Sequence, residues 1–210
     1  MEARSLEVRA AFVEASEFVL AAMDGVSDDQ WARPGLGEWT VRELVVHATR
    51  AWSTVIQYAD APGELTLAGP SAYYTAVLGS ADDLHAQVAQ RTREQAASID
   101  EPVAEHAHRL FHDAEEVLER TPADHVLGTF AGGIRLVDYL PTRVVELVIH
   151  GIDLCDAIGR PVAVPPASME LTLEVLVDLA TERPGAVDPA HLVRALTGRA
   201  PFPGDLNLLG

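Results

Sequence analysis

Apolar residues return every three or four positions along most of the chain, and this spacing predicts long helices. The first predicted helix covers about residues 2–23, with apolar positions at Leu6, Val8, Ala11, Phe12, Ala15 and Val19. The pattern then stops, because residues 24–39 contain a proline and three glycines. We expect a loop there.

The second helix has the clearest start in the sequence. Thr40 and Glu43 are spaced as a capping box, in which the threonine hydroxyl and the glutamate carboxylate each satisfy a free backbone N–H group. The apolar pattern predicts that this helix runs from the cap to about Tyr58.

The later part of the chain predicts further helices and one small sheet. Residues 81–120 predict one long helix, or two helices broken near residues 100–102, where a proline interrupts the pattern. Short β-type runs around two adjacent glycines predict a β-hairpin at 126–137. Three more helices are predicted at about residues 140–158, 167–182 and 188–198.

The number and length of these elements predict a mostly α fold, namely an up-down four-helix bundle with a small β-hairpin. We expect the bundle in residues 1–160, and in residues 161–210 a short helical C-terminal extension packed on it. Apolar residues make up 48% of the chain and aromatic residues only 6%. This composition favours an aliphatic helical core over a β-sandwich.

The chain is strongly acidic, with 15 basic residues against 32 acidic ones and a formal net charge of −17. All the basic residues are arginines, and they form no basic run. Such a charge repels nucleic-acid phosphates and anionic membrane surfaces. We therefore expect neither a nucleic acid nor a membrane as a partner.

The single cysteine, Cys155, cannot form an internal disulfide, which suits a reducing compartment. The first residues carry acids where a signal peptide needs a basic start. No apolar run approaches the roughly 18 residues of a membrane span. These features predict a cytoplasmic protein.

Two residues of the helix predicted at 140–158 have metal-ligand spacing. Glu146 and His150 lie at i and i+4, so they share one helix face with Arg143 and Asp153. The rest of this helix is almost wholly apolar, which predicts a central place in the bundle. The alternative is that the polar stripe is simply the solvent face, since this spacing is common by chance.

His47, in the capped helix, is the third candidate ligand. On its own it is better explained as a histidine at the edge of the core that donates to a backbone carbonyl. With Glu146 and His150 it would give three protein ligands and leave positions for water or substrate, as in a catalytic metal site. Asp153 or Glu43 would then orient an imidazole ring from behind.

A rival group of histidines lies at His106, His108 and His112. The last two have metal-ligand spacing, but they fall opposite the apolar face of their helix and are predicted to point toward solvent. Cys155 lies on the apolar arc of its own helix, away from any base, and is predicted to be a small core residue.

Two segments about a hundred residues apart together resemble a known family. The first is WARP at residues 31–34 with GEWTVRELVVH at 37–47, and the second is RVVELVIHGIDL at 143–154. A weaker match, LTGR, lies at 196–199. They resemble the mycothiol-dependent maleylpyruvate isomerase-like proteins, which belong to the DinB-like superfamily of metal-binding four-helix bundles.

The resemblance implies a divalent metal, usually zinc, held by His47, Glu146 and His150. It also implies a low-molecular-weight thiol cosubstrate such as mycothiol, which adds to an electrophilic substrate in an isomerisation or S-transfer. The isomerase itself carries a larger C-terminal domain than residues 161–210 provide, so the resemblance does not extend to maleylpyruvate as the substrate.

Two functions therefore compete. The first is a metal-dependent thiol S-transferase or isomerase, in which Arg143 would steady an anionic substrate and Asp153 would support a ligand. The second is a non-catalytic helical module that binds a ligand or partner. A homodimer is compatible with either function.

Overall fold

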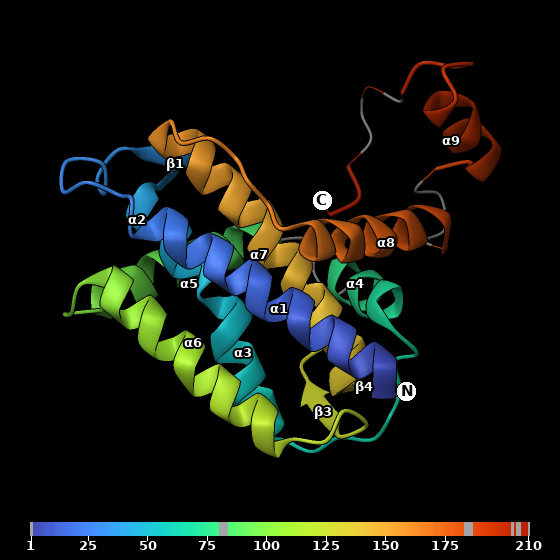
Figure 1. Cartoon of the computed structure of the whole chain (residues 1–210), viewed down its shortest axis with the longest axis horizontal. Coiled ribbons are helices and arrows are strands. Elements are labelled where there is room, and N and C mark those ends of the chain that lie inside the picture. Colours follow the sequence, from blue (N-terminus) through green and yellow to red (C-terminus); the bar gives the residue numbers. More distant parts are fainter. Residues whose placement is uncertain (1, 80–83, 183–186, 203, 205–206, 210) are drawn as a thin grey trace.

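The structure, a computed structural model, describes residues 2–79, 84–182, 187–202, 204 and 207–209. Its elements follow one another along the chain as Figure 1 shows. The helices are α1 (Glu2–Met23), α2 (Val41–Ala48), α3 (Arg50–Ala59), α4 (Pro70–Leu78), α5 (Leu84–Ser98), α6 (Val103–Arg120), α7 (Leu136–Ile158), α8 (Pro166–Glu182) and α9 (Pro189–Leu196). The strands are β1 (Pro34–Leu36), β2 (Trp39–Thr40), β3 (Val126–Thr129) and β4 (Gly132–Arg135).

The predicted four-helix bundle is confirmed. Helix α1 packs along α7, α6 packs against α3, and the α2–α3 segment contacts α7. Helix α7 is the central element, because its apolar residues are buried around most of its circumference. Gly151 permits the close approach of α1, since a Cβ atom there would lie 2.4 Å from Cε1 of Phe18.

The segment around residues 24–58 differs from the prediction in two places. The predicted loop contains the short antiparallel pair β1 and β2. The predicted single helix is divided into α2 and α3 at Thr49, whose hydroxyl donates to the carbonyl oxygen of Val46 at 2.7 Å. Such a local side-chain bond competes with the regular helical pattern. The capping box of Thr40 and Glu43 is confirmed.

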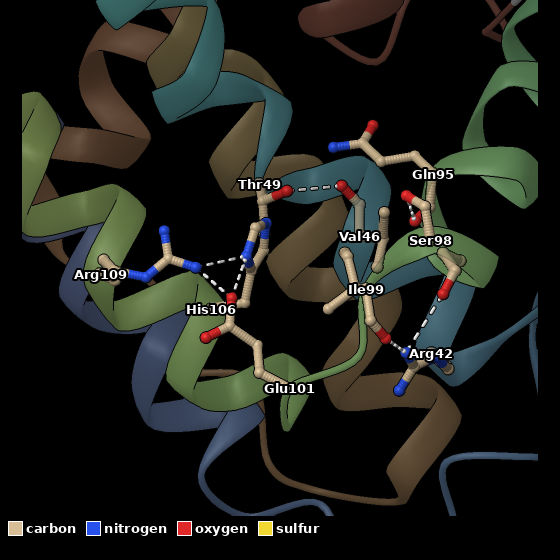
Figure 2. Close-up of polar contacts among 10 residues, drawn as sticks. Arg42, Val46, Thr49, Gln95, Ser98, Ile99, Glu101, His106 and Arg109 are labelled. Atoms are coloured by element: carbon tan, nitrogen blue, oxygen red, sulfur yellow. Dashed lines mark hydrogen bonds and ion pairs between the residues drawn. The ribbon is translucent and has the colours of Figure 1, made fainter.

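Residues 84–120 form two helices, the second of the two predicted alternatives, and residues 81–83 of the predicted range lie outside the described residues. Their junction is held by Arg42, whose guanidinium donates to the carbonyl oxygens of Ala96 and Ile99 at 3.1 and 2.8 Å. Figure 2 shows Arg42 beside Ile99. Beyond the junction, Glu101 pairs with His106 and Arg109. Arg42 thereby caps the C-terminal end of α5 and fastens α5 to α2.

The β3–β4 hairpin is confirmed, but α7 begins earlier than predicted. Leu136 and Val137, assigned to the hairpin by their β-type composition, form the first turn of the helix. A short apolar run does not separate strand from helix by its periodicity, which explains the error. Pro141 lies inside the second turn of α7.

The C-terminal segment contains the two predicted helices. Helix α8 packs against α1 and α7, and the Ser168 hydroxyl donates to the carbonyl oxygen of Ala11 at 2.9 Å. Helix α9 lies apart from the bundle in Figure 1. The division into residues 1–160 and 161–210 stays a prediction. Within the described residues, no helix is both long and apolar enough to cross a membrane.

Candidate metal centre

Three candidate ligands meet between α2 and α7. His47, Glu146 and His150 each offer one ligand atom, and these atoms lie within 4.8 Å of one another. The rings of His47 and His150 are 4.7 Å apart between centroids and nearly perpendicular, at 82°. Among the described residues no other group of three histidine, cysteine or acidic side chains is arranged in this way. We call these three residues the ligand cluster.

The polar stripe of α7 faces the interior of the bundle and is not a solvent face. The side chains of His150 and Glu146 are 12% and 26% exposed, and Arg143 is buried. Since α7 is surrounded by other helices, its polar residues point toward α2, where His47 lies. The i, i+4 spacing then places the Glu146 Oε2 atom 3.5 Å from His150 Nε2.

Each histidine of the cluster has a polar partner at its other ring nitrogen. His150 Nδ1 lies 3.2 Å from the Asp153 carboxylate, and His47 Nδ1 lies 3.3 Å from the Thr92 hydroxyl. This leaves the Nε2 atom of each ring as the ligand atom. Asp153 therefore lies where the sequence predicted, whereas Glu43 is engaged in the capping box.

Thr92 was not predicted, because it belongs to α5 and to no motif near the ligands. The Thr92 hydroxyl is the partner of the His47 ring. A backbone carbonyl was the partner expected for a histidine at the edge of the core. The Arg42 cap described above holds α5 beside α2, and so it keeps Thr92 within reach of His47.

Burial and charge set the protonation states of the cluster. Burial lowers the pKa of His47 to about 3, and the charge of His150 acts in the same direction. Burial opposes a charge on Glu146, but the hydrogen bond from His150 and the charge of Arg143 outweigh it and lower this pKa to about 2. Burial also opposes a charge on His150, yet Asp153 and Glu146 raise its pKa to about 9. At neutral pH a neutral His47 therefore lies beside the ion pair of Glu146 and His150.

Tyr74 of α4 is a second residue that sequence reasoning missed. Its buried hydroxyl lies 3.0 Å from the carbonyl oxygen of Thr142 and 3.1 Å from Oε1 of Glu146. Burial raises the pKa of Tyr74 well above its ordinary value, so the hydroxyl stays protonated and donates. The only sequence signal was a pair of adjacent tyrosines in a chain poor in aromatic residues.

Arg143 lies one turn before Glu146 and is held by aromatic rings. Its guanidinium carbon is 4.9 Å from the ring centroid of Tyr139 and 5.7 Å from that of Tyr73. Such cation–π contacts stabilise a buried guanidinium that has lost its water. Arg143 and Glu146 both line one pocket, so the ligand cluster borders a space for a small molecule.

The rival histidines of α6 do not form a site. His108 pairs with Asp24 at 2.9 Å and His112 lies 3.6 Å from Glu116, and both side chains are largely exposed, as predicted. His106 contacts Glu101 and Arg109 instead (Figure 2). Cys155 is buried in the core, as predicted, and burial raises its pKa.

Comparisons with known proteins identify the family and the fold of this chain. A crystal structure of a histidine-to-alanine mutant of the mycothiol-dependent maleylpyruvate isomerase matches 86% of this chain and 69% of its own, with a TM-score of 0.52. The identity is 15%, so this match shows a shared DinB-like helical fold. No curated protein matches the chain.

The family model of the mycothiol maleylpyruvate isomerase N-terminal domain matches residues 12–155, which include the whole ligand cluster. The chain therefore belongs to the mycothiol maleylpyruvate isomerase N-terminal domain family.

Proposed function

We propose that this protein is a metal-dependent enzyme in which His47, Glu146 and His150 hold one divalent ion, most suitably zinc. The enzyme activates a low-molecular-weight thiol, such as mycothiol, for S-transfer to an electrophile or for isomerisation. The observation that carries the proposal is the convergence of three ligand atoms from two helices within 4.8 Å, beside a pocket.

The donor set fits a divalent metal. Two imidazole nitrogens and one carboxylate are the ligands of many catalytic zinc sites, which leave a position open for water or substrate. Asp153 and Thr92 contact the Nδ1 atoms of the two imidazole rings and so orient them, as ligand-supporting groups do in metalloenzymes. When bound, such an ion supplies Lewis acidity that lowers the pKa of a coordinated thiol.

The protein's own residues prepare the site for this role. Tyr74 donates a hydrogen bond to the Glu146 carboxylate. Against the effect of burial, the hydrogen bond from His150 and the charge of Arg143 keep that carboxylate ionised. Burial keeps His47 neutral, with a free lone pair. His150 carries a proton that must leave before its nitrogen can become a ligand, and Asp153 fixes its ring meanwhile.

The decisive test uses cobalt in place of zinc, because a thiolate bound to cobalt gives a strong charge-transfer absorption. We expect the purified protein to bind about one ion per chain, and mycothiol or a simple alkyl thiol to produce this absorption at neutral pH. A protein that binds cobalt but shows no spectral change with any thiol would be a metal protein without thiol chemistry. A protein that binds no metal would be better described as the non-catalytic module.

Two further features of this proposal are expectations. The single buried cysteine is compatible with work in the reducing cytoplasm. A homodimer is compatible with the exposed apolar residues of α8, Leu173 and Val177, which light scattering can test.

A further inference from the structure

A second hydrophobic cluster lies apart from the main core, where α4, α7 and α8 meet. Its buried residues are Tyr74 of α4, Val145 of α7, and Val175 and Leu179 of α8. The leucines at 208 and 209, near the C-terminus, pack against it. We call this group the second core. Half of its buried residues come from the C-terminal segment, so this segment helps to form the surroundings of α4.

The position of α4 depends on this packing. The helix has only nine residues, and Gly69 at its N-cap position has no side chain that could cap it. So short a helix is not stable by itself and needs tertiary contacts. It packs against α8, α7 and β4, and Figure 1 shows it beside α8. Loss of apolar side chains from α8 should therefore let α4 shift.

Tyr74 joins the second core to the ligand cluster. Its ring belongs to the second core, and its hydroxyl lies 3.1 Å from Oε1 of Glu146 and 3.0 Å from the carbonyl oxygen of Thr142. The hydroxyl has a single hydrogen, and the charged carboxylate is the stronger acceptor of the two. Hydrogen bonds weaken steeply when their geometry is disturbed. A shift of α4 would therefore weaken the bond to Glu146.

The two oxygens of the Glu146 carboxylate have different partners. Oε1 lies beside the Tyr74 hydroxyl, whereas Oε2 lies 3.5 Å from Nε2 of His150, the ligand atom of that ring. A carboxylate can bind a metal ion through one oxygen or through both. A hydrogen bond at Oε1 occupies that oxygen, so Oε2 is the one left to face an ion.

We propose that Tyr74 is a positioning residue that presents Glu146 to the metal through Oε2 alone, and that the C-terminal segment holds Tyr74 in place through the second core. The metal centre then requires this segment, although His47, Glu146 and His150 all lie outside it. The positioning of Tyr74 rests on the packing. Its effect on metal binding rests on the proposed function.

The first experiment measures zinc affinity of full-length variants by competition with a chelating dye. Tyr74→Phe keeps the ring and removes only the hydroxyl, and it should weaken zinc binding by about 10- to 100-fold, as loss of a ligand-supporting group does. Leu179→Ala should weaken it by about tenfold, because α4 loses its support. Unchanged zinc affinity in Tyr74→Phe would overturn the proposal.

Leu171→Ala is the matched control for Leu179→Ala. Both are buried leucines of α8, but Leu171 belongs to the main core. Truncation of either should destabilise the fold, whereas Leu171→Ala should leave zinc affinity within about threefold of wild type. Equal losses of affinity in the two leucine variants would overturn the proposal, because the effect would then be one of general stability.

A spectrum tests the role of the second oxygen. The visible absorption of bound cobalt weakens when its coordination number rises. Cobalt-loaded Tyr74→Phe should therefore absorb less strongly than wild type, because Oε1 of Glu146 is free to join the ion. An unchanged cobalt spectrum would overturn the assignment of Oε2 as the only ligand oxygen.

The second experiment is a double-mutant cycle in urea, on metal-free protein. Tyr74→Phe should raise the unfolding constant by about tenfold in the wild-type background, and by less than about twofold in Leu179→Ala, where the hydrogen bond is already weakened. Additive effects would overturn the link between the second core and Tyr74. Val175→Ala removes fewer atoms from the same cluster and serves for the cycle where Leu179→Ala does not fold.

The metal-free cycle separates this inference from the proposed function. If the wild-type chain binds no zinc, the proposed function fails, and the cycle alone decides whether the C-terminal segment positions Tyr74. If wild type and Tyr74→Phe bind zinc equally, the positioning role fails while the proposed set of three ligands stands.

Discussion

Two groups of histidines in this protein have the same helical spacing and opposite surroundings. His150 follows Glu146 by four residues on α7, and His112 follows His108 by four residues on α6. The first pair meets His47 inside the bundle, whereas the second pair points outward, with side chains 49% and 71% exposed. Spacing alone therefore does not distinguish a pair inside the bundle from a pair on the surface.

The difference comes from the position of each helix. Helix α6 has one buried face and one solvated face, and its histidines lie on the solvated one. Helix α7 is packed by α1, α2 and α8, so its polar stripe faces another helix. A polar group in such a place costs free energy unless it is paired. The partners Asp153, Thr92 and Tyr74 meet that need.

The strongest test of this comparison removes one histidine from each group. His47→Ala and His150→Ala should lower zinc affinity on the order of a thousandfold or more, because each removes one of the three proposed protein ligands. His112→Ala should leave affinity and stoichiometry unchanged. Metal content by mass spectrometry and competition with a chelating dye measure both quantities. Zinc loss in His112→Ala would show that metal binds at the surface of α6 instead.

A second test compares the two carboxylates that contact a histidine of each group. Asp153 contacts His150 at 3.2 Å and Asp24 contacts His108 at 2.9 Å, so the two pairs are similar in geometry. Asp153→Asn should weaken zinc binding by about 10- to 100-fold, as loss of a ligand-supporting carboxylate does. Asp24→Asn should have no effect. Equal affinities in the two variants would mean that Asp153 does not support the ligand.

The third test uses pH. In the metal-free protein His150 has a pKa of about 9 and must lose its proton to bind zinc, whereas His47, at about 3, and Glu146, at about 2, are already deprotonated at neutral pH. Lower pH favours the protonated His150, so zinc affinity should fall by about tenfold per pH unit between pH 8 and 6. Calorimetry in buffers of different ionisation enthalpy should show release of about one proton. Release of two protons would mean that His47 is charged before metal binds.

Much of the fold was predictable because local signals agreed with tertiary packing. The first helix, the capping box and the β3–β4 hairpin depend on residues close together in sequence. The division at Thr49 and the early start of α7 were not predicted. In the first case a threonine side chain bonds its own helix, and in the second an apolar run suits strand and helix equally.

The candidate site was predictable in part. His47, Glu146 and His150 carry motif signals, and the helical spacing of Asp153 from His150 placed it correctly. Thr92 and Tyr74 come from α5 and α4, which approach the cluster only through the fold.

The smallest expected effect concerns stability. His108→Ala and His112→Ala should each change the free energy of unfolding by no more than about 0.5 kcal/mol, because exposed ion pairs contribute little. Urea denaturation of the metal-free protein measures this, with wild type as reference. A loss well above about 1 kcal/mol would mean that the surface histidines hold α6 in place. The histidines of α6 would then contribute to the free energy of unfolding. The two groups would differ in that one is proposed to bind metal and the other stabilises the fold.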